Sequence, residues 1–443
     1  MKARLVPLYF ENALDPDFIN QVNALKSLLA EEADILEPGR LGAALPDVDA
    51  VVFPQMLGNA YRRLEDVLAI EVPILVATSE FGTVSMWDWE INSYLRAEGK
   101  KVIAPYNLEQ TKIICRALAM RRTMRQSKFI VFQDNPGEGF QASIFKRFYW
   151  WEDECTQRIK VKFGMEIHKR SFKEIAAFAK TIPQEAAETV WREWQSRLPR
   201  LGDIPQHSIY SAIKLYMALR QVLEEDDTIL GIGINCLNES HFSDTTPCLA
   251  CNMLFEEKGL IWGCEVDTLA MLTKLLVYQS LRKPVMMTNL YPFLMEQAAL
   301  KHERIPNFPV VDERSEDHIL AAHCGYLGVV PQSFATEWNL RKKVLAIVDE
   351  NSIVLDARLP VGDVTLVKLD ASMKKLSVVE GELRGYAQFP GSDCLNGAII
   401  RVPDGQKLMD ELASHHYILV TGHHLPSLRN IARIFDLEIC MIE

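Results

Sequence analysis

The sequence is poor in the features that mark several specialised classes of protein. It has no long run of lysine and arginine, and its formal net charge is −11. Because binding to a nucleic-acid backbone depends on clustered basic side chains, nucleic acid is excluded as the main partner. No apolar run approaches the ~18 residues that a membrane-spanning helix needs. Nine cysteines, an odd number scattered along 443 residues, do not form the pattern of a disulfide framework.

The N-terminus also lacks the marks of a secretory signal. Residues 1–18, MKARLVPLYFENALDPDF, hold only a short apolar run that turns acidic at once, and no small-residue cleavage site follows. Hydrophobic residues make up 48% of the chain and charged residues 24%, which is typical of a soluble globular protein. We therefore expect a cytoplasmic protein with reduced thiols and no membrane partner.

The length predicts about three domains at ~150 residues each. Short apolar runs alternate with amphipathic ones in residues 1–168, as ARLVPLYF (3–10) does with the helical pattern of 17–32. Such alternation predicts βα units around a parallel sheet. No G-x-G-x-x-G follows the first strand, so no dinucleotide site is inferred.

The same alternation continues in residues 169–325, where strands are expected at 228–236 and 260–267 with a helix between them. The glycines of GIG in the first of these strands favour a tight strand end over a phosphate loop. From 326 to 443 the pattern changes to strand-like runs separated by turn residues, with little helical period. This last region predicts a small β-barrel or sandwich.

Polar side chains follow the predicted strands of the central region. An open parallel sheet binds ligands outside the carboxyl ends of its strands. At those ends the sequence places Asn235 and Cys236, then Glu265 and Asp267, then Asn289, then His323. Oxygen and imidazole ligands together suit Mn²⁺, Fe²⁺, Co²⁺ or Zn²⁺. Each residue alone is explained as readily by a helix cap, an ion pair, a turn or a structural hydrogen bond, so their shared location carries the prediction.

Four of the ten histidines fall in LASHHYILVTGHHLP. The run HHYILVTG has strand composition, so neighbouring side chains point to opposite faces, and at most one of His415 and His416 is expected to face a given site. His423 and His424 lie past the glycine, near the start of the last predicted helix. There we expect them to face solvent or to cap that helix.

Two other motifs favour structural roles. Cys248 and Cys251 share one helical face, but no second CxxC and no thioredoxin-like setting accompanies them, so a zinc or redox role is the minor alternative. The aromatic stretches MWDW (86–89) and FYWWED (148–153) are expected in the core, with subunit contact as the second interpretation.

Several stretches of this chain, taken in order, resemble the L-fucose isomerase and L-arabinose isomerase superfamily. They are GCEVDTLAMLT (263–273), LAAHCG (320–325), VGDVTLVKL (361–369) and HHYILVTG (415–422). SMWDWEINSYLRAEG (85–99) and KFGMEI (162–167) resemble segments of its N-terminal half. The resemblance covers most of the chain and is strongest after about Gly231, and the ordered set is far more specific than any one motif.

The resemblance implies an α/β protein with two Rossmann-like parallel-sheet domains, over 1–168 and 169–325, followed by a mostly-β, barrel-like domain over 326–443. It implies a divalent metal, usually Mn²⁺, and a ring-opened aldose converted to a ketose through an enediolate. It also implies a homo-oligomer in which the N-terminal domain of a neighbour completes each active site, here through Trp87 or Trp89.

The resemblance also assigns site residues. Glu265 matches the family's first acidic ligand and base, and His323 and His416 match the histidine ligands of the arabinose isomerase branch. Asn289 stands where the family has a second acidic ligand. An amide oxygen can bind a metal, but it cannot shuttle a proton, and it removes one negative charge from the site. The proton relay would then fall to Asp267, a bound water or another group.

The leading hypothesis is a metal-dependent aldose–ketose isomerase, an intramolecular oxidoreductase. In it Glu265 is base and ligand, Asn289 a weak ligand, and His323 and His416 metal ligands. Two alternatives stay open. One is a sugar-binding or regulatory paralogue that has lost catalysis through Asn289. The other is a metal-dependent sugar epimerase or lyase that uses the same enediolate stabilisation.

Overall fold

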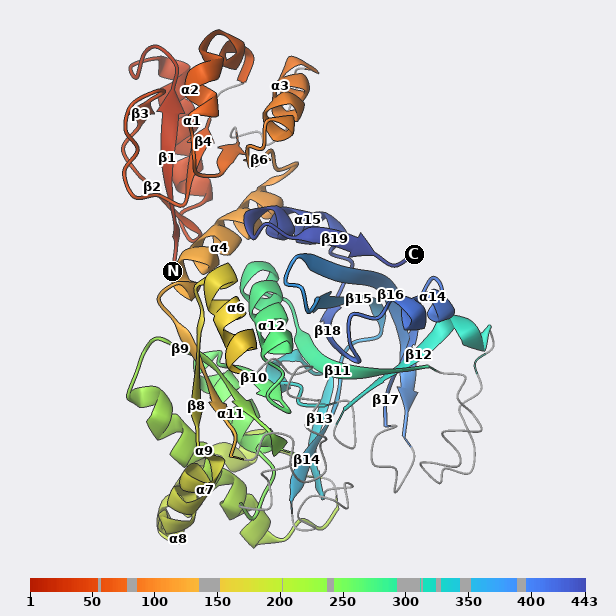
Figure 1. The fold of residues 1–443 in the computed structure, drawn as a ribbon. Coiled ribbons are helices and arrows are strands. Elements are labelled where there is room, and N and C mark those ends of the chain that lie inside the picture. The colour runs from red at the N-terminus through yellow and green to blue at the C-terminus, as the bar shows by residue number, and fades with distance from the viewer. Residues whose placement is uncertain are drawn as a thin grey trace. The chain divides into compact units, whose positions relative to one another are not determined.

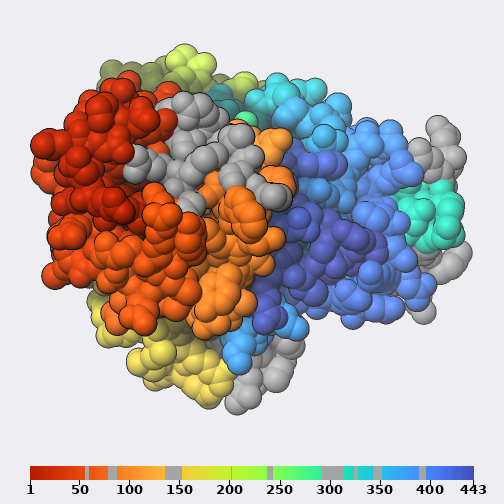
Figure 2. All heavy atoms as spheres, turned by 90° about the horizontal axis from the view of Figure 1, so that it is seen from above, coloured from red at the N-terminus to blue at the C-terminus, as the bar shows by residue number. Residues whose placement is uncertain are grey.

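The computed structural model describes the chain in eleven segments. These are residues 1–54, 57–77, 86–134, 152–200, 202–236, 243–292, 311, 314–323, 328–342, 352–388 and 396–443. The chain forms two compact units: an N-terminal unit of Met1–Arg125, Gln279–Arg282 and Pro426–Glu438, and a larger unit of Gln126–Tyr278, Lys283–Leu425 and Ile439–Glu443. In Figure 2 the red to orange residues of the N-terminal unit form one continuous body. The expected domain boundaries at 168/169 and 325/326 stay predictions.

The N-terminal unit is built on a sheet with the strand order β2-β1-β4-β5-β6, in which every neighbouring pair is parallel, and β3 pairs with β1. The strands are β1 (Ala3–Tyr9), β2 (Ala33–Ile35), β3 (Gly39–Arg40), β4 (Ala50–Phe53), β5 (Ile74–Val76) and β6 (Val102–Ile103). The helices are α1 (Pro16–Leu28), η1 (Leu57–Arg63), α2 (Leu64–Leu68), α3 (Met86–Ala97), α4 (Leu108–Met124) and, late in the chain, α15 (Leu425–Ile434). The expected parallel βα units are confirmed here.

Helices α1 and α4 begin at capping side chains. Asp15 accepts a hydrogen bond from the backbone N–H of Asp17 at 2.9 Å, and Pro16 occupies the first helical position, where its missing N–H costs nothing. Asn107 accepts from the N–H of Gln110 at 2.9 Å. The short polar residues before each amphipathic run therefore fix where these helices start.

Helix α3 presents the reverse of the expected pattern at its N-terminal end. Trp87 and Trp89 are 60% and 62% exposed, whereas Asp88 and Asn92 are each 2% exposed. The prediction that the MWDW tryptophans belong to the core is wrong, because the inward positions of this turn are taken by polar residues four apart. Of FYWWED, residues 148–151 lie outside the described residues.

The larger unit contains a second parallel sheet, in the order β10-β9-β7-β8 (Figure 1). Its strands are β7 (Lys128–Phe132), β8 (Glu166–Arg170), β9 (Ile229–Ile234) and β10 (Ile261–Cys264). The helices are α6 (Asp153–Phe163), α7 (Phe172–Thr181), α8 (Gln184–Trp194), η2 (Gln195–Arg197), α9 (Gln206–Glu224), α11 (Cys248–Lys258) and α12 (Thr268–Leu281). The α/β class is confirmed, and the Rossmann-like description of the two parallel sheets stays a prediction.

Glycines in β9 and β10 bring α12 close to this sheet. A Cβ atom at Gly263 would lie 2.4 Å from Cγ of Met271 on α12, and one at Gly233 would lie 3.1 Å from its sulfur. A side chain at Gly263 would therefore displace Met271, and one at Gly233 would crowd its sulfur, so the two glycines let Met271 pack close to the sheet. The GIG glycines lie inside β9 rather than at the expected strand end.

The larger unit also contains a closed antiparallel barrel of six strands in the order β15-β18-β11-β12-β17-β16, closed by pairing of β15 with β16 (Figure 1). The strands are β11 (Val285–Pro292), β12 (His318–Ala322), β15 (Gly362–Leu369), β16 (Lys375–Ala387), β17 (Gly397–Arg401) and β18 (His416–Thr421). Strand β19 (Glu438–Met441) pairs with β16. Strand β13 (Glu337–Lys342) pairs with β14 (Ile353–Arg358) in a separate two-stranded sheet. The expected C-terminal barrel is thus present.

The barrel corrects one expectation about the central region. Strands β11 and β12 were expected to extend the parallel sheet, but they run antiparallel to β18 and β17 in the barrel. Residues Val285 to Thr288 of β11 are all buried, so this strand is covered on both faces. Such an apolar run does not show whether a strand is parallel or antiparallel to its neighbours. Among the described residues, no helix combines the length and apolar character needed to cross a membrane.

Lys274 is an unusual member of the core of the larger unit. Its side chain is fully buried in α12, and its Nζ lies 2.9 Å from the ring centroid of Trp262. Among the described residues, Nζ has no hydrogen-bond partner. Burial lowers the pKa of this amine well below its ordinary value, although the nearby thiols of Cys264 and Cys251 oppose the shift.

Replacing Lys274 by methionine is expected to stabilise the protein by about 1–3 kcal/mol at neutral pH, because methionine has a similar length and no polar group to desolvate. Below pH 10.5 Lys274 is protonated in the unfolded chain, whereas burial opposes its protonation in the folded chain. The stabilisation by methionine should therefore shrink as the pH rises toward 10.5. Thermal denaturation over this pH range measures both effects, with the exposed Lys258→Met as control. An unchanged Tm would mean that the amine makes a compensating contact.

Candidate metal centre

Glu265 and Val266 form the centre of a strained turn between β10 and α12. Their φ angles are 56° and 59°, and the N–H of Asp267 donates to the carbonyl of Cys264 at 3.1 Å. Two successive positive φ angles are the pattern of a type I′ turn, which non-glycine residues adopt at a cost of about 1–3 kcal/mol each. Val266 is fully buried, so core packing holds the turn in place. This turn places Glu265 directly after the carboxyl end of β10.

Asp267 joins three elements through one carboxylate. Its Oδ1 accepts from the N–H of Ala270 at 2.8 Å and so caps α12. Its Oδ2 accepts from Nδ1 of His416 and from Nζ of Lys368, both at 2.9 Å. All three side chains are at most 2% exposed. Burial alone would raise the pKa of Asp267. The ion pair with Lys368 and the hydrogen bond from His416 outweigh this effect, so the pKa lies below its ordinary value.

Two imidazoles lie against the carboxylate of Glu265. Nε2 of His416 is 3.8 Å from Oε1 of Glu265, and Nε2 of His323 is 3.7 Å from the same oxygen. The two rings are stacked, with centroids 5.5 Å apart. Because metal–ligand bonds are about 2 Å long, the ligand atoms around one ion lie roughly 3–4 Å apart. Each of the two imidazole nitrogens therefore lies at such a spacing from the carboxylate oxygen of Glu265.

Both imidazoles are held in their neutral form. Burial lowers the pKa of His323 to about 3, helped by the neighbouring His416. Burial also lowers the pKa of His416 to about 4, although the hydrogen bond to Asp267 opposes the shift. A neutral imidazole whose Nδ1–H is given to a carboxylate presents the lone pair of Nε2, which is the arrangement in which histidine binds metals.

His415 lies closer to the cluster than the strand pattern predicted. One donor atom from each of Glu265, His415 and His416 lies within 4.8 Å of the others, and the two histidine rings have centroids 4.0 Å apart. The expectation that these histidines face opposite ways is therefore wrong. Strand β18 begins at His416, so the alternation of faces does not extend back to His415.

Asn289 lies next to this cluster in the barrel. It is paired with His416 across β11 and β18, and residues directly opposite on antiparallel strands share one face of the sheet. Its Nδ2 donates to the hydroxyl of Tyr291 at 3.1 Å. Its Oδ1 is buried, and no described residue gives it a hydrogen bond. An oriented amide oxygen without a donor suits a cation or a ligand hydroxyl.

The structure thus brings Glu265, His323 and His416 together, but by a different route from the one expected. Glu265 does follow a parallel strand, as do Asn235 and Cys236. Nδ2 of Asn235 donates to Oε1 of Gln133, the residue directly after the neighbouring strand β7, at 3.2 Å. His323 instead follows a barrel strand. The proton-relay role of Asp267 stays a prediction, and its contacts are those of a residue that positions His416.

Lys368 is the functional neighbour that sequence reasoning missed. It lies in β15, where it is the only charged residue in the run from Val364 to Leu369, and it is 1% exposed. An isolated lysine within an apolar strand needs a buried acidic partner, since an unpaired buried ammonium is costly. That signal was present in VTLVKL.

The remaining motifs have structural roles. Burial raises the pKa of Cys248 to about 12 and that of Cys251 further, so both thiols of α11 stay protonated. His423 and His424 directly precede α15, as expected, and their Nε2 atoms contact the carbonyls of Gly381 and Thr421.

Comparison with known proteins leaves the family open. No family model matches the chain, and no curated protein matches it.

Asp267→Asn is expected to lower the free energy of unfolding by about 3–5 kcal/mol, because it leaves the buried ammonium of Lys368 without an anionic partner. Adding Lys368→Met should recover most of this loss. Metal affinity in the double variant should stay ~10–100-fold below wild type, because His416 has lost the carboxylate that orients it. Thermal denaturation and calorimetric titration with Mn²⁺ measure the two effects. A double variant with wild-type Mn²⁺ affinity would contradict the positioning role.

Proposed function

We propose that this protein is a metal-dependent aldose–ketose isomerase, with Mn²⁺ as the cofactor and an open-chain sugar as the substrate. The observation that carries the proposal is the buried meeting of one carboxylate, Glu265, with two neutral imidazoles, His323 and His416, one of them held by Asp267. Carboxylate–histidine pairs of this kind orient metal ligands and fix their tautomer. The resemblance to the L-fucose and L-arabinose isomerases supplies the reaction class.

The roles follow from the chemistry of the residues. A bound divalent cation would polarise two neighbouring sugar oxygens. The carboxylate of Glu265 is the base that takes the proton from the carbon beside the carbonyl. Asp267, paired with Lys368, keeps His416 in one tautomer and is the candidate for the proton relay. Asn289 offers an oriented acceptor, and its amide does not titrate near neutral pH.

The proposal extends to assembly and location. We propose a cytoplasmic homo-oligomer in which the exposed Trp87 or Trp89 of one copy approaches the site of a neighbour. The Rossmann-like character of the two parallel sheets belongs to the same proposal.

The second candidate is a sugar-binding or regulatory protein on the same fold. It is favoured by Asn289, whose buried oxygen suits ligand binding but not proton transfer. A metal-dependent epimerase or lyase is the third candidate, and the identity of the product distinguishes it.

The central test is an aldose panel incubated with Mn²⁺ or with a chelator, followed by NMR. We expect metal-dependent formation of a ketose, loss of that activity in His416→Ala, and a ~10–100-fold reduction in His415→Ala through altered support of its neighbour. His423→Ala, outside the cluster, is the matched control. Equal and small effects at His415 and His416 would contradict the metal assignment, and epimers or cleavage products would favour the third candidate.

Asn289→Asp is expected to tighten Mn²⁺ binding, because it adds an anionic oxygen in a partly desolvated site. Calorimetric titration measures this directly. Unchanged affinity would mean that Asn289 does not face the metal. An inactive wild type that gains isomerase activity on this substitution would establish the binding protein as the correct function, whereas a slower variant of an active wild type would place the proton relay elsewhere.

A further inference from the structure

Two buried amide side chains lie at the carboxyl ends of the parallel sheet in the larger unit. Gln133 directly follows β7 and Asn235 directly follows β9, and these two strands are neighbours in the sheet. Nδ2 of Asn235 donates to Oε1 of Gln133 at 3.2 Å. Gln133 is 9% exposed, and Asn235 is fully buried. The two side chains therefore form one amide pair at this edge of the sheet.

The amide pair leaves one acceptor and one donor without partners. In the part of the chain that the structure describes, Oδ1 of Asn235 and Nε2 of Gln133 have no hydrogen-bond partner. Rotating both amides by 180° exchanges the roles of the two residues but again leaves one free acceptor and one free donor. Buried polar atoms without partners are costly, so we expect a third group to complete the pair.

The order of the strands makes this edge a place where ligands bind. In the order β10-β9-β7-β8, the chain leaves β7 toward β8 on one side and leaves β9 toward β10 on the other. Open α/β sheets bind ligands outside the carboxyl ends of the strands at the point where the connections part in this way. Gln133 and Asn235 follow the two strands between which the connections part.

The amide pair is level with Glu265 along the same edge. The last residues of β7, β9 and β10 are paired with one another, so the next residue on each strand, Gln133, Asn235 and Glu265, lies at the same level. Neighbouring strands are about 4.8 Å apart, so Asn235 is one strand spacing from Glu265 and Gln133 is two. An open chain of five or six carbons spans roughly 5–6 Å, because each C–C bond is about 1.5 Å long. A sugar whose reacting carbons lie against Glu265 can therefore reach the amide pair with its far end.

A ligand group that completes the amide pair must both donate and accept a hydrogen bond. A hydroxyl group does both. A carboxylate cannot donate to Oδ1 of Asn235, and an ammonium cannot accept from Nε2 of Gln133. A primary carboxamide is another neutral group that does both. Of these two groups, the hydroxyl is the one that an open-chain sugar carries along its length.

We propose that Gln133 and Asn235 determine substrate specificity by holding one hydroxyl group of the open-chain sugar, at the end remote from the carbons on which Glu265 acts. This inference rests on the proposed function for the identity of the ligand and for the role of Glu265. A site built to hydrogen-bond a hydroxyl rejects a ligand that does not present it there, because the buried polar groups are then left unpaired. The amide pair therefore selects among sugars that differ in the configuration of one hydroxyl.

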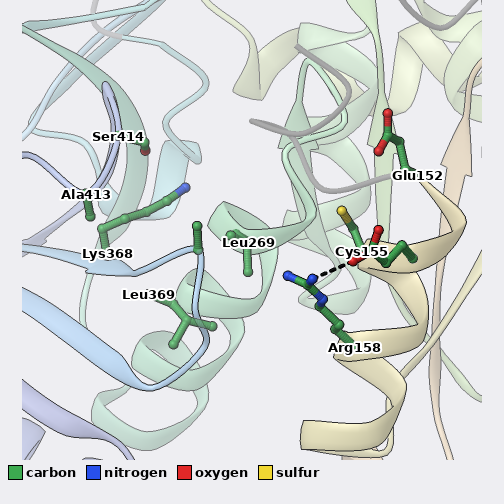
Figure 3. Close-up of a pocket in the computed structure, with 10 residues that line it drawn as sticks. Glu152, Cys155, Arg158, Leu269, Lys368, Leu369, Ala413 and Ser414 are labelled. Atoms are coloured by element: carbon green, nitrogen blue, oxygen red, sulfur yellow. Dashed lines mark hydrogen bonds and ion pairs between the residues drawn. The ribbon is translucent and has the colours of Figure 1, made fainter. Parts of the chain in front are cut away.

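A cavity of about 280 Å³ elsewhere in the larger unit provides a control site (Figure 3). Its described lining residues include Leu269, Lys368 and Ala413, but neither Gln133 nor Asn235. Ala413→Leu adds bulk to the wall of this cavity and leaves the amide pair unchanged. The variant therefore separates binding in the cavity from binding at the edge of the sheet.

The test is calorimetric titration of the full-length protein, with Mn²⁺ and with a chelator, by ribitol, xylitol, D-arabinitol and L-arabinitol. These pentitols carry hydroxyl groups on a five-carbon chain but no carbonyl, so they can bind without being isomerised. The double variant Gln133→Met, Asn235→Leu should weaken binding of the tightest pentitol roughly 10–100-fold, because two hydrogen bonds are lost, and should reduce the preference among the four. It should fold, since both amides are replaced together by apolar groups of similar shape. Ala413→Leu and the exposed Gln184→Met should bind as wild type does.

Four results would overturn the inference. The first is that no pentitol binds. The second is that the double variant binds every pentitol as wild type does, which would mean that water alone completes the amide pair. The third is that Ala413→Leu removes binding while the double variant keeps it, which would place the pentitol in the cavity. The fourth is that nicotinamide, a primary carboxamide, binds in place of the pentitols and is lost in the double variant.

Isomerase assays of the same variants separate this inference from the proposed function. Ketose formation by wild type, with an unchanged KM in the double variant, would leave the proposed function standing and remove the specificity role. Pentitol binding that depends on Gln133 and Asn235, in a protein that forms no ketose, would remove the proposed function and leave the amide pair as a polyol site.

Discussion

The carboxylate of Asp267 is the constraint on which the candidate site depends. It caps α12 through one oxygen and holds Lys368 of β15 and His416 of β18 through the other. Each of these groups would be costly in the interior without the others, because a buried charge needs both a counter-charge and hydrogen bonds. The parallel sheet and the barrel therefore meet at one polar junction, and the position of His416 follows from it.

Strain beside this junction is offset by packing. Glu265 and Val266 adopt positive φ angles, which few non-glycine residues do, and the turn stays in place because Val266 is buried and Met271 fills the space left by Gly233 and Gly263. Of the two glycines that looked like a weak phosphate motif, Gly233 serves this close packing. The same local geometry that costs free energy directs the carboxylate of Glu265 toward two imidazoles.

The sequence predicted the elements better than their connections. Periodicity located the parallel βα units and the change to a strand-rich region near the C-terminus, because burial patterns are local. It misplaced β11 and β12, since a strand covered on both faces looks the same in a parallel sheet and in a barrel. It also misjudged His415, because strand alternation holds only within a strand, and Trp87 and Trp89, because nothing in MWDW shows which residues face inward. The meeting of Glu265 with His416 was reachable only through the family resemblance.

The closed barrel has a consequence for how the site comes into being. Asp267 and His416 are 149 residues apart, and they meet only when β18 inserts between β11 and β15. Closing such a long segment carries a large entropic cost, and until it closes the charges of Asp267 and Lys368 remain in water. Insertion of one strand therefore desolvates the ion pair and completes the imidazole cluster in a single step. Local opening of β18 in the native state would undo both at once, so hydrogen exchange in that strand and residence time of a bound ion are governed by the same motion.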